Sequence, residues 1–218
     1  VSILGPSGCG KTTTLRMIAG FEHPEDGDVL FDGQSVGQVP VNKRNIGMVF
    51  QSYALFPHMT VEQNVAYGLE QHGAAKSEIP GRVREALEMV HMEEFSKRKP
   101  KQLSGGQRQA LTLLMASLKQ PKLLLLDEHT AALDPKTAAK VLALSDQIVQ
   151  ENRLTTLMIT HNMKDAIAHG NRLIMMDAGR VVVDISGEEK KKLTVPDLLA
   201  LFSSASGSTE ANDKLLLS

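Results

Sequence analysis

A glycine-rich octapeptide near the start of the chain constrains the fold more than any other feature. Its sequence, Gly5-Pro6-Ser7-Gly8-Cys9-Gly10-Lys11-Thr12, matches the pattern G-x-x-x-x-G-K-[ST]. The apolar residues before it predict a buried strand, and those after it predict a helix over 11–19 that Gly20 ends. A glycine loop between a strand and a helix binds phosphate, because backbone N–H groups and the helix N-terminus face the anion.

Two residues at the end of this phosphate-binding loop (residues 5–12) have predicted roles. We expect Lys11 to reach the β- and γ-phosphates of a nucleotide and the Thr12 hydroxyl to ligate Mg²⁺. Cys9 is the only cysteine, so no internal disulfide forms, and it serves as a small loop residue. The predicted nucleotide-binding residues here are Gly5, Pro6, Ser7, Gly8, Cys9, Gly10, Lys11, Thr12 and Thr13.

Strands and helices alternate along the rest of the chain. The fully apolar run 123–126 predicts a strand covered on both faces, and Asp134-Pro135 predicts the start of a helix that continues to about Glu151. Other strands are predicted at 28–31, 45–50, 155–159, 172–176 and 181–183, and another helix at 82–92. The fold class is therefore α/β, with a parallel sheet that helices cover on both faces, an antiparallel β-portion and an inserted helical subdomain at about 52–118.

Two carboxylates follow the most apolar strand. Asp127 ends that strand, so it lies at the carboxyl edge of the sheet, where ligands bind in such folds. We expect Asp127 to hold Mg²⁺, directly or through water, and Glu128 to act as the base that polarises the attacking water. An exposed strand end is the alternative for such a pair taken alone, and Lys11 in the same chain favours the catalytic interpretation.

A second segment, Leu103-Ser104-Gly105-Gly106-Gln107, predicts another anion site, and we name it the signature segment. Ser104 predicts a helix N-cap, and the glycines leave N–H groups unblocked. One chain rarely needs two phosphate sites of this kind for one nucleotide, so we infer that two chains share each nucleotide. The predicted contacts are Ser104, Gly105, Gly106 and Gln107.

Almost the whole chain resembles the ATP-hydrolysing subunits of ATP-binding cassette (ABC) transporters, whose motifs occur here in the same order. The resemblance adds Gln51 in VFQSYALFPH, the loop Ala132-Leu133-Asp134, and His161 in MITHNM. It implies a single nucleotide-binding domain with a RecA-like, P-loop NTPase core. Two such chains would sandwich two molecules of ATP with Mg²⁺, head to tail.

The resemblance also implies individual roles. Gln51 would sense Mg²⁺ and the attacking water, Ser104 and Gly106 would contact the γ-phosphate bound by the opposing chain, and His161 would contact the γ-phosphate. Asp134 would lie at the dimer interface. From the residues alone, the roles of Gln51 and His161 stay open. Each ends a predicted strand, where it could be either functional or structural.

Partners follow from the same resemblance: a second ATPase subunit, in a homodimer or pseudo-symmetric dimer, a transmembrane permease and a solute-binding protein. The permease would contact the segment Tyr53-Ala54-Leu55-Phe56-Pro57 and hold the chain at the cytoplasmic face of the cell membrane. Judged by residues alone, that apolar segment is a packed hinge or a docking surface. A net charge of −1 favours neither nucleic acid nor an anionic membrane, and no apolar run approaches the length of a membrane span.

Three departures from the family pattern affect these expectations. The chain begins just before the phosphate-binding loop, so we expect an incomplete N-terminus without the strands that carry an adenine-stacking aromatic. His129 and Ala131 stand where the family often has Pro and Ser. Residues 1–107 resemble importer ATPases for polyamines, sugars and iron, whereas the sequence from about Gln109 resembles a separate branch of importer ATPases. A hybrid chain is our hypothesis, which predicts different best families for the two halves searched separately.

The C-terminal tail and two charged runs also have expected properties. The Ser/Gly-rich tail at about 203–218 is expected to be flexible, and the charged runs 97–99 and 188–192 to be solvated. The alternatives to a transporter subunit are a soluble non-transport ABC ATPase, an impaired nucleotide-binding fragment or hybrid, and a small-molecule kinase. The motifs do not name the transported substrate, and importer direction rests on the resemblance.

Overall fold

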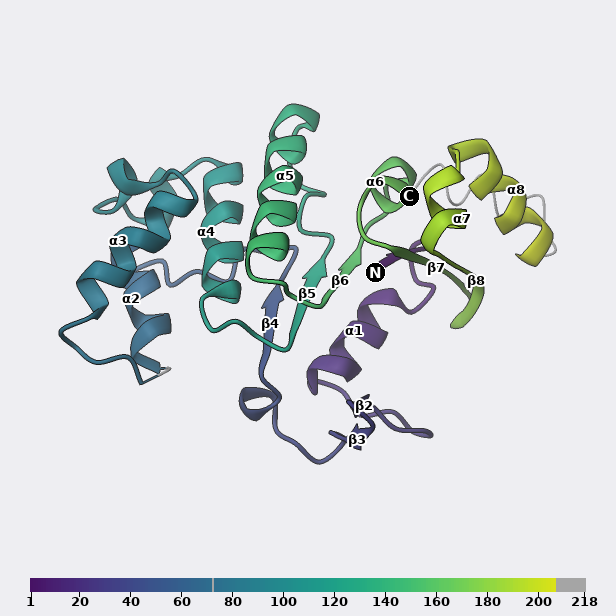
Figure 1. The fold of residues 1–218 in the computed structure, drawn as a ribbon, viewed down its shortest axis with the longest axis horizontal. Helices are drawn as coiled ribbons and strands as arrows, with labels where there is room; N and C mark the ends of the chain where they lie inside the picture. The colour runs from purple at the N-terminus through teal and green to yellow at the C-terminus, as the bar shows by residue number, and fades with distance from the viewer. Residues whose placement is uncertain (72, 207–218) are drawn as a thin grey trace. The chain divides into compact units, whose positions relative to one another are not determined.

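The computed structural model describes residues 1–71 and 73–206, and its larger sheet has six strands in the order β4-β5-β6-β1-β7-β8 (Figure 1). The strands are β1 (Ser2–Leu4), β4 (Ile46–Val49), β5 (Leu123–Asp127), β6 (Thr156–Ile159), β7 (Arg172–Asp177) and β8 (Arg180–Ser186). Strand β1 pairs in parallel with β6 and β7, with Ser2 opposite Met158 and Leu173. Strand β8 pairs antiparallel with β7. The predicted α/β fold with a parallel sheet core is confirmed.

The remaining elements are a small hairpin and the helices. Strands β2 (Leu30–Phe31) and β3 (Gln34–Ser35) form an antiparallel pair. The helices are α1 (Lys11–Ala19), α2 (Val61–Gln71), α3 (Ile79–Met89), α4 (Gly105–Ser117), α5 (Pro135–Glu151), α6 (Met163–Ala168), α7 (Gly187–Lys192) and α8 (Val195–Ser206), with short 3-10 helices η1 (Val41–Lys43), η2 (Glu93–Phe95) and η3 (Pro100–Gln102). None of the helices in the described part of the chain combines the length and apolar character that crossing a membrane requires.

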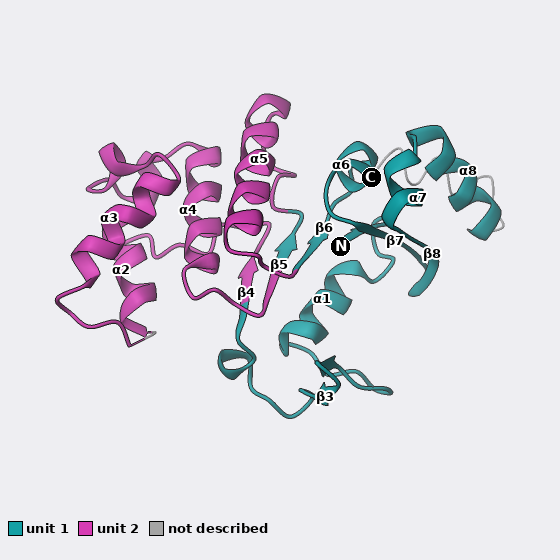
Figure 2. Cartoon of the chain, viewed as in Figure 1, with its two compact units in different colours: residues 1–46, 125–128, 156–218 teal, residues 47–124, 129–155 magenta. Residues whose placement is uncertain are grey.

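The chain divides into two compact units (Figure 2). Unit 1 comprises residues 1–46, 125–128 and 156–218, and unit 2 comprises residues 47–124 and 129–155. The boundary runs through β4 and β5. Unit 2 contains the whole stretch predicted as a helical subdomain and α5 as well, and the limits of that subdomain stay a prediction.

Unit 1 is built on the pairing of β1 with its neighbours. Leu4 of β1 and Leu173 and Met175 of β7 are fully buried in one apolar cluster with Ala166 of α6 and Phe202 of α8. Helices α6 and α8 therefore cover one face of this part of the sheet. Burial of each large apolar side chain contributes about 1.5–3 kcal/mol to folding.

Unit 2 is mainly helical, and its helices pack through apolar stripes. Helix α2 contacts α3 and α4, and α4 contacts α5. The buried apolar residues of α2 and α3 recur mostly every three or four positions, as expected where one face of a helix is covered. These residues are Val61, Val65 and Leu69 in α2 and Ile79, Val83, Ala86 and Leu87 in α3.

Two expectations require correction. Helix α3 begins and ends earlier than the predicted range 82–92: Pro80 lies in its first turn, where the missing N–H is harmless, and His91 beyond it has a left-handed φ of 53°. The run 188–192 was expected to be solvated, yet it forms most of α7, and Lys190 is only 2% exposed. Helix α8 continues to Ser206, and the rest of the predicted flexible tail, residues 207–218, lies outside the described residues.

Candidate nucleotide-binding site

The phosphate-binding loop has a backbone that only glycine permits at several positions. Gly8 and Gly10 have left-handed φ values of 79° and 99°. A Cβ on Gly5 would lie 2.3 Å from the carbonyl oxygen of Met176 and 2.7 Å from Sγ of Cys9, so the loop packs directly on the end of β7. The Gly179 N–H also donates to the Cys9 carbonyl over 3.0 Å. Cys9 is buried in this packing, as expected for a small loop residue.

Lys11 is folded back into this loop. Its side chain is only 6% exposed, and its Nζ donates to the carbonyl oxygens of Gly5 over 2.7 Å and Pro6 over 3.1 Å. A third contact, to Cys9 Sγ at 3.9 Å, is weak. A buried ammonium whose third contact is weak can bind an anion, because a phosphate oxygen makes a stronger, charge-assisted bond than the sulfur does.

Thr12 and Asp127 meet at the predicted metal position. Thr12 Oγ1 donates to Asp127 Oδ1 over 3.2 Å, so the end of β5 lies beside the first turn of α1. Burial raises the pKa of Asp127, and the charge of Glu128 raises it further, while the bond from Thr12 and the charges of Arg16 and Lys11 lower it. A hydroxyl and a carboxylate are hard oxygen ligands, which fit Mg²⁺, and a bound cation would offset the burial of the carboxylate.

Glu128 and His161 lie together next to this pair. Glu128 has a left-handed φ of 45°, a conformation that costs a non-glycine residue about 1 kcal/mol or more. Its N–H donates to the carbonyl oxygen of Ile159, at the end of β6, over 3.1 Å, and this bond helps to hold the left-handed conformation. His161 Nδ1 lies 3.9 Å from Glu128 Oε2, and both side chains keep access to solvent. A carboxylate in this position can polarise a water molecule.

The other predicted site residues lie in unit 2. Ser104 caps α4, where its Oγ accepts from the Gln107 N–H over 3.2 Å and Gln107 Oε1 accepts from the Ser104 N–H over 2.9 Å. Asp134 caps α5 by accepting from the Thr137 N–H over 3.1 Å, and bonds from Thr137 lower its pKa. Gln51 is exposed in the bend after β4. These residues and the phosphate-binding loop therefore belong to different units (Figure 2).

Sequence reasoning missed a buried contact made by His129. This side chain is 3% exposed, and its Nε2 lies 3.0 Å from Oγ of Ser145 in α5. Ser145 Oγ donates to the Val141 carbonyl over 2.8 Å. The proline common in the family at this position has no side-chain nitrogen for such a contact. The sequence signals only the departure from the family, because the partner lies 16 positions away.

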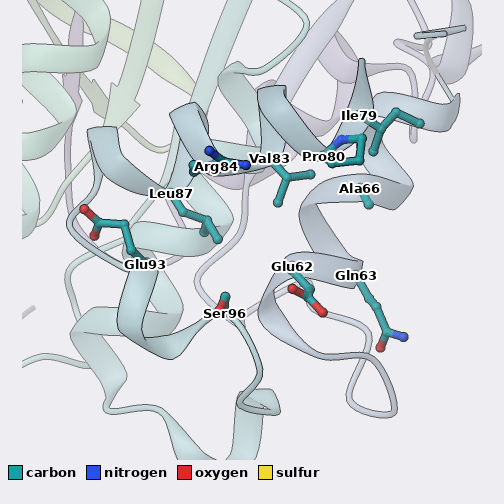
Figure 3. Close-up of a pocket in the computed structure, with 10 residues that line it drawn as sticks. All are labelled: Glu62, Gln63, Ala66, Ile79, Pro80, Val83, Arg84, Leu87, Glu93 and Ser96. Atoms are coloured by element: carbon teal, nitrogen blue, oxygen red, sulfur yellow. The ribbon is translucent and has the colours of Figure 1, made fainter. Parts of the chain in front are cut away.

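An apolar hollow in unit 2 is separate from these residues. It has a volume of about 470 Å³ and lies among α2, α3 and η2. Figure 3 shows Val83 and Leu87 of α3 facing it, with Glu62 and Glu93 at its rim. Among the described residues, those that line the hollow include none of the predicted nucleotide contacts.

Comparison with known proteins gives one family. The family model described as "ABC transporter" matches residues 1–131, more than half of the chain. The chain is 51% identical over 181 residues to the putrescine transport ATP-binding protein PotG of Escherichia coli, covering 83% of this chain and 48% of that protein. It is 48% identical over 189 residues to the spermidine/putrescine import ATP-binding protein PotA of Vibrio cholerae, covering 87% of this chain and 50% of that protein. The chain thus spans about half the length of the curated relatives it matches.

Solved structures agree with this result. The ATP-binding cassette MJ0796, in a dimeric post-hydrolysis state bound to ADP and Pi, has a TM-score of 0.74 and 33% identity, covering 85% of this chain and 84% of that chain. Clostridium perfringens cbiO1, part of the ABC transporter complex cbiONQ, has a TM-score of 0.80 and 28% identity, covering 93% of this chain and 82% of that chain.

The matches also bear on the hybrid hypothesis. A match of 181 residues extends into both halves of the chain, because neither half has that length. One relative is therefore similar to both halves. The expectation that each half alone has a different best family stays a prediction.

Proposed function

The chain belongs to the ABC transporter family, and on that premise we propose that it is the ATP-binding and ATP-hydrolysing subunit of an importer. The observation that carries the proposal is the arrangement in unit 1, where Lys11 lies in the phosphate-binding loop and Thr12 bonds to Asp127. Glu128 follows Asp127 directly and lies 3.9 Å from His161. These groups supply phosphate binding, metal binding and water activation in one place.

Each residue then has a distinct task in hydrolysis. Lys11 and the N-terminus of α1 bind and orient the β- and γ-phosphates, and Glu128 accepts a proton from the attacking water. Thr12 and Asp127, with Gln51, would hold Mg²⁺, which supplies charge neutralisation on the phosphate oxygens. His161 contacts the γ-phosphate and, at 3.9 Å, can also orient the Glu128 carboxylate.

Two chains complete each site in this proposal. The signature segment presents the capped N-terminus of α4, with the N–H groups of Gly105 and Gly106, to the γ-phosphate bound by the opposing chain. Asp134 and the loop before it contribute to the same interface. The dimer of the ATP-binding cassette MJ0796 supports this arrangement for a protein 33% identical to this chain.

The partners and the solute extend the proposal beyond the chain. A permease subunit binds near residues 53–57 and holds the chain at the cytoplasmic face of the membrane, and a solute-binding protein delivers the solute. The names of PotG and PotA favour a polyamine such as putrescine or spermidine as the solute.

The Glu128→Gln variant tests the proposed function. Glutamine preserves the shape of the side chain but cannot accept the proton, so we expect ATP turnover to fall at least about 100-fold while the Kd for ATP changes less than about threefold. Turnover is measured by phosphate release and binding by isothermal titration, with Glu188→Gln on the exposed surface of α7 as the control. Near-normal turnover in Glu128→Gln would rule out Glu128 as the base.

A further inference from the structure

Three segments of unit 2 converge on the first turn of α4. A Cβ on Gly105 would lie 3.0 Å from Cδ2 of Leu133 and 3.1 Å from the hydroxyl oxygen of Tyr53. A Cβ on Gly106 would lie 2.5 Å from Cγ2 of Thr137 in α5. Because Gly105 and Gly106 have no side chain, residues from three segments can approach the first turn of α4 closely. Tyr53 is the one that belongs to the segment after Gln51.

A second contact joins Tyr53 to α4. The guanidinium carbon of Arg108 lies over the Tyr53 ring, 4.6 Å from its centroid, which is a cation–π geometry. Arg108 lies one turn after Ser104, and its N–H donates to the Ser104 carbonyl over 3.0 Å. Its Nε is buried and makes no hydrogen bond within the described residues. The aromatic face is therefore a principal partner that fixes this guanidinium.

From these contacts we propose that Tyr53 and Arg108 are positioning residues that tie the segment after Gln51 to the signature segment. The Tyr53 ring holds Arg108 and the Tyr53 hydroxyl lies beside Gly105, so a shift of residues 53–57 would act on the first turn of α4 through both contacts. The inference rests on the proposed function, in which this turn contacts the γ-phosphate of the opposing chain. It adds a physical link, within one unit, between the segment expected to meet the permease and that phosphate contact.

The stack is not needed to form the helix. Ser104 and Gln107 already cap α4 reciprocally, and its buried face is supplied by residues such as Leu111 and Leu114. Tyr53 and Arg108 are both partly exposed. Removing the stack should therefore leave α4 folded and alter only how firmly its first turn is held.

Turnover and binding measurements on the full-length protein test the proposal. We expect Tyr53→Ala and Arg108→Ala each to lower turnover about five- to tenfold with an unchanged Kd for ATP, because the phosphate-binding loop belongs to unit 1. The double variant should be no worse than either single variant, since the two residues act as a unit. Tyr53→Phe retains the ring face and should restore most of the turnover.

Arg98→Ala is the matched control. Arg98 lies over the Phe95 ring at 4.7 Å, an equivalent stack that does not involve α4, so its loss should change turnover less than twofold. Wild-type turnover in both Tyr53→Ala and Arg108→Ala, additive losses, or a Tyr53→Phe variant as slow as Tyr53→Ala would overturn the inference. Absence of ATP binding in the wild-type protein would instead overturn the proposed function. Should Tyr53→Ala fail to fold, Arg108→Ala and Tyr53→Phe decide the question.

Discussion

At the scale of single residues, two buried lysines in unit 1 differ in how fully the hydrogen bonds of their ammonium groups are used. Lys190 Nζ donates to the carbonyls of Ile167, His169 and Gly170 over 2.7–2.9 Å, which uses all three of its N–H bonds. Lys11 has two carbonyl acceptors and one weak sulfur contact. Lys190 is therefore saturated and structural, whereas Lys11 can exchange a weak partner for a phosphate.

The saturation of Lys190 predicts a large effect on stability. Lys190→Met should lower the free energy of unfolding by about 2–3 kcal/mol, because the three carbonyls that accept from Nζ lose a charged donor. Lys191→Met is the control: Lys191 pairs with Glu188 on the exposed face of α7, so its loss should change stability by less than about 0.5 kcal/mol. Urea unfolding measures both, and equal effects would contradict the structural role of Lys190.

The carboxyl group of Asp165 in α6 predicts that the stability of the folded state depends on pH. Burial raises its pKa above the ordinary value of 3.8, and the charges of His169 and His161 offset this in part. Above pH 3.8 the folded state therefore binds more protons than the unfolded state, so stability falls as the pH rises through the folded pKa. Asp165→Asn should unfold at a higher temperature than wild type at pH 7, and the difference should shrink below pH 3.8. If the difference in unfolding temperature between Asp165→Asn and wild type did not change with pH, ionisation of Asp165 would not be its cause.

At the scale of elements, glycines set how closely helices and strands approach in unit 2. A Cβ on Gly47 in β4 would lie 2.2 Å from the carbonyl oxygen of Ala116 in α4, so the strand and the helix touch through their backbones. Gly68 lies inside α2, and a Cβ there would meet only Cδ1 of Leu118, at an ordinary 3.8 Å. Glycine is required at the first position and replaceable at the second.

The two glycines therefore predict stability changes of opposite sign. Gly47→Ala should destabilise by about 2 kcal/mol or more, because the backbone of α4 cannot move aside like a side-chain end. Gly68→Ala should stabilise by about 0.5–1 kcal/mol through helix propensity and reduced unfolded-state entropy. Thermal unfolding measures both changes. A neutral Gly47→Ala variant would mean that β4 and α4 do not approach so closely.

Elements with local signals were predictable, whereas contacts between distant residues were not. Gly20 ends α1, Ser104 caps α4 and Asp134 caps α5 as the sequence indicates, because each cap depends on residues within one turn. Asp127 and Glu128 were predicted as site residues from their place at the end of an apolar strand, and that role stays a prediction. The burial of Lys190 and the stack of Tyr53 on Arg108 depend on packing partners about 20 or more positions away, which no local pattern encodes.

At the scale of the whole molecule, the predicted site residues fall into two sets. Unit 1 holds the phosphate-binding loop, Asp127, Glu128 and His161, and unit 2 holds Gln51, the signature segment and Asp134. Each set includes a helix N-terminus, at α1 and at α4, where backbone N–H groups can bind an anion. Two chains that exchange these sets would complete two nucleotide sites, which is the central claim of the proposed function.

The mass of the Glu128→Gln variant in solution, measured by sedimentation with and without ATP and Mg²⁺, tests this claim most directly. Because this variant should bind ATP without hydrolysing it, we predict a monomer without nucleotide and a dimer with it. Ser104→Arg should remain a monomer in the same background while still binding ATP, because the side chain would block the opposing phosphate. A Glu128→Gln variant that is saturated with ATP and remains a monomer would contradict the two-chain site.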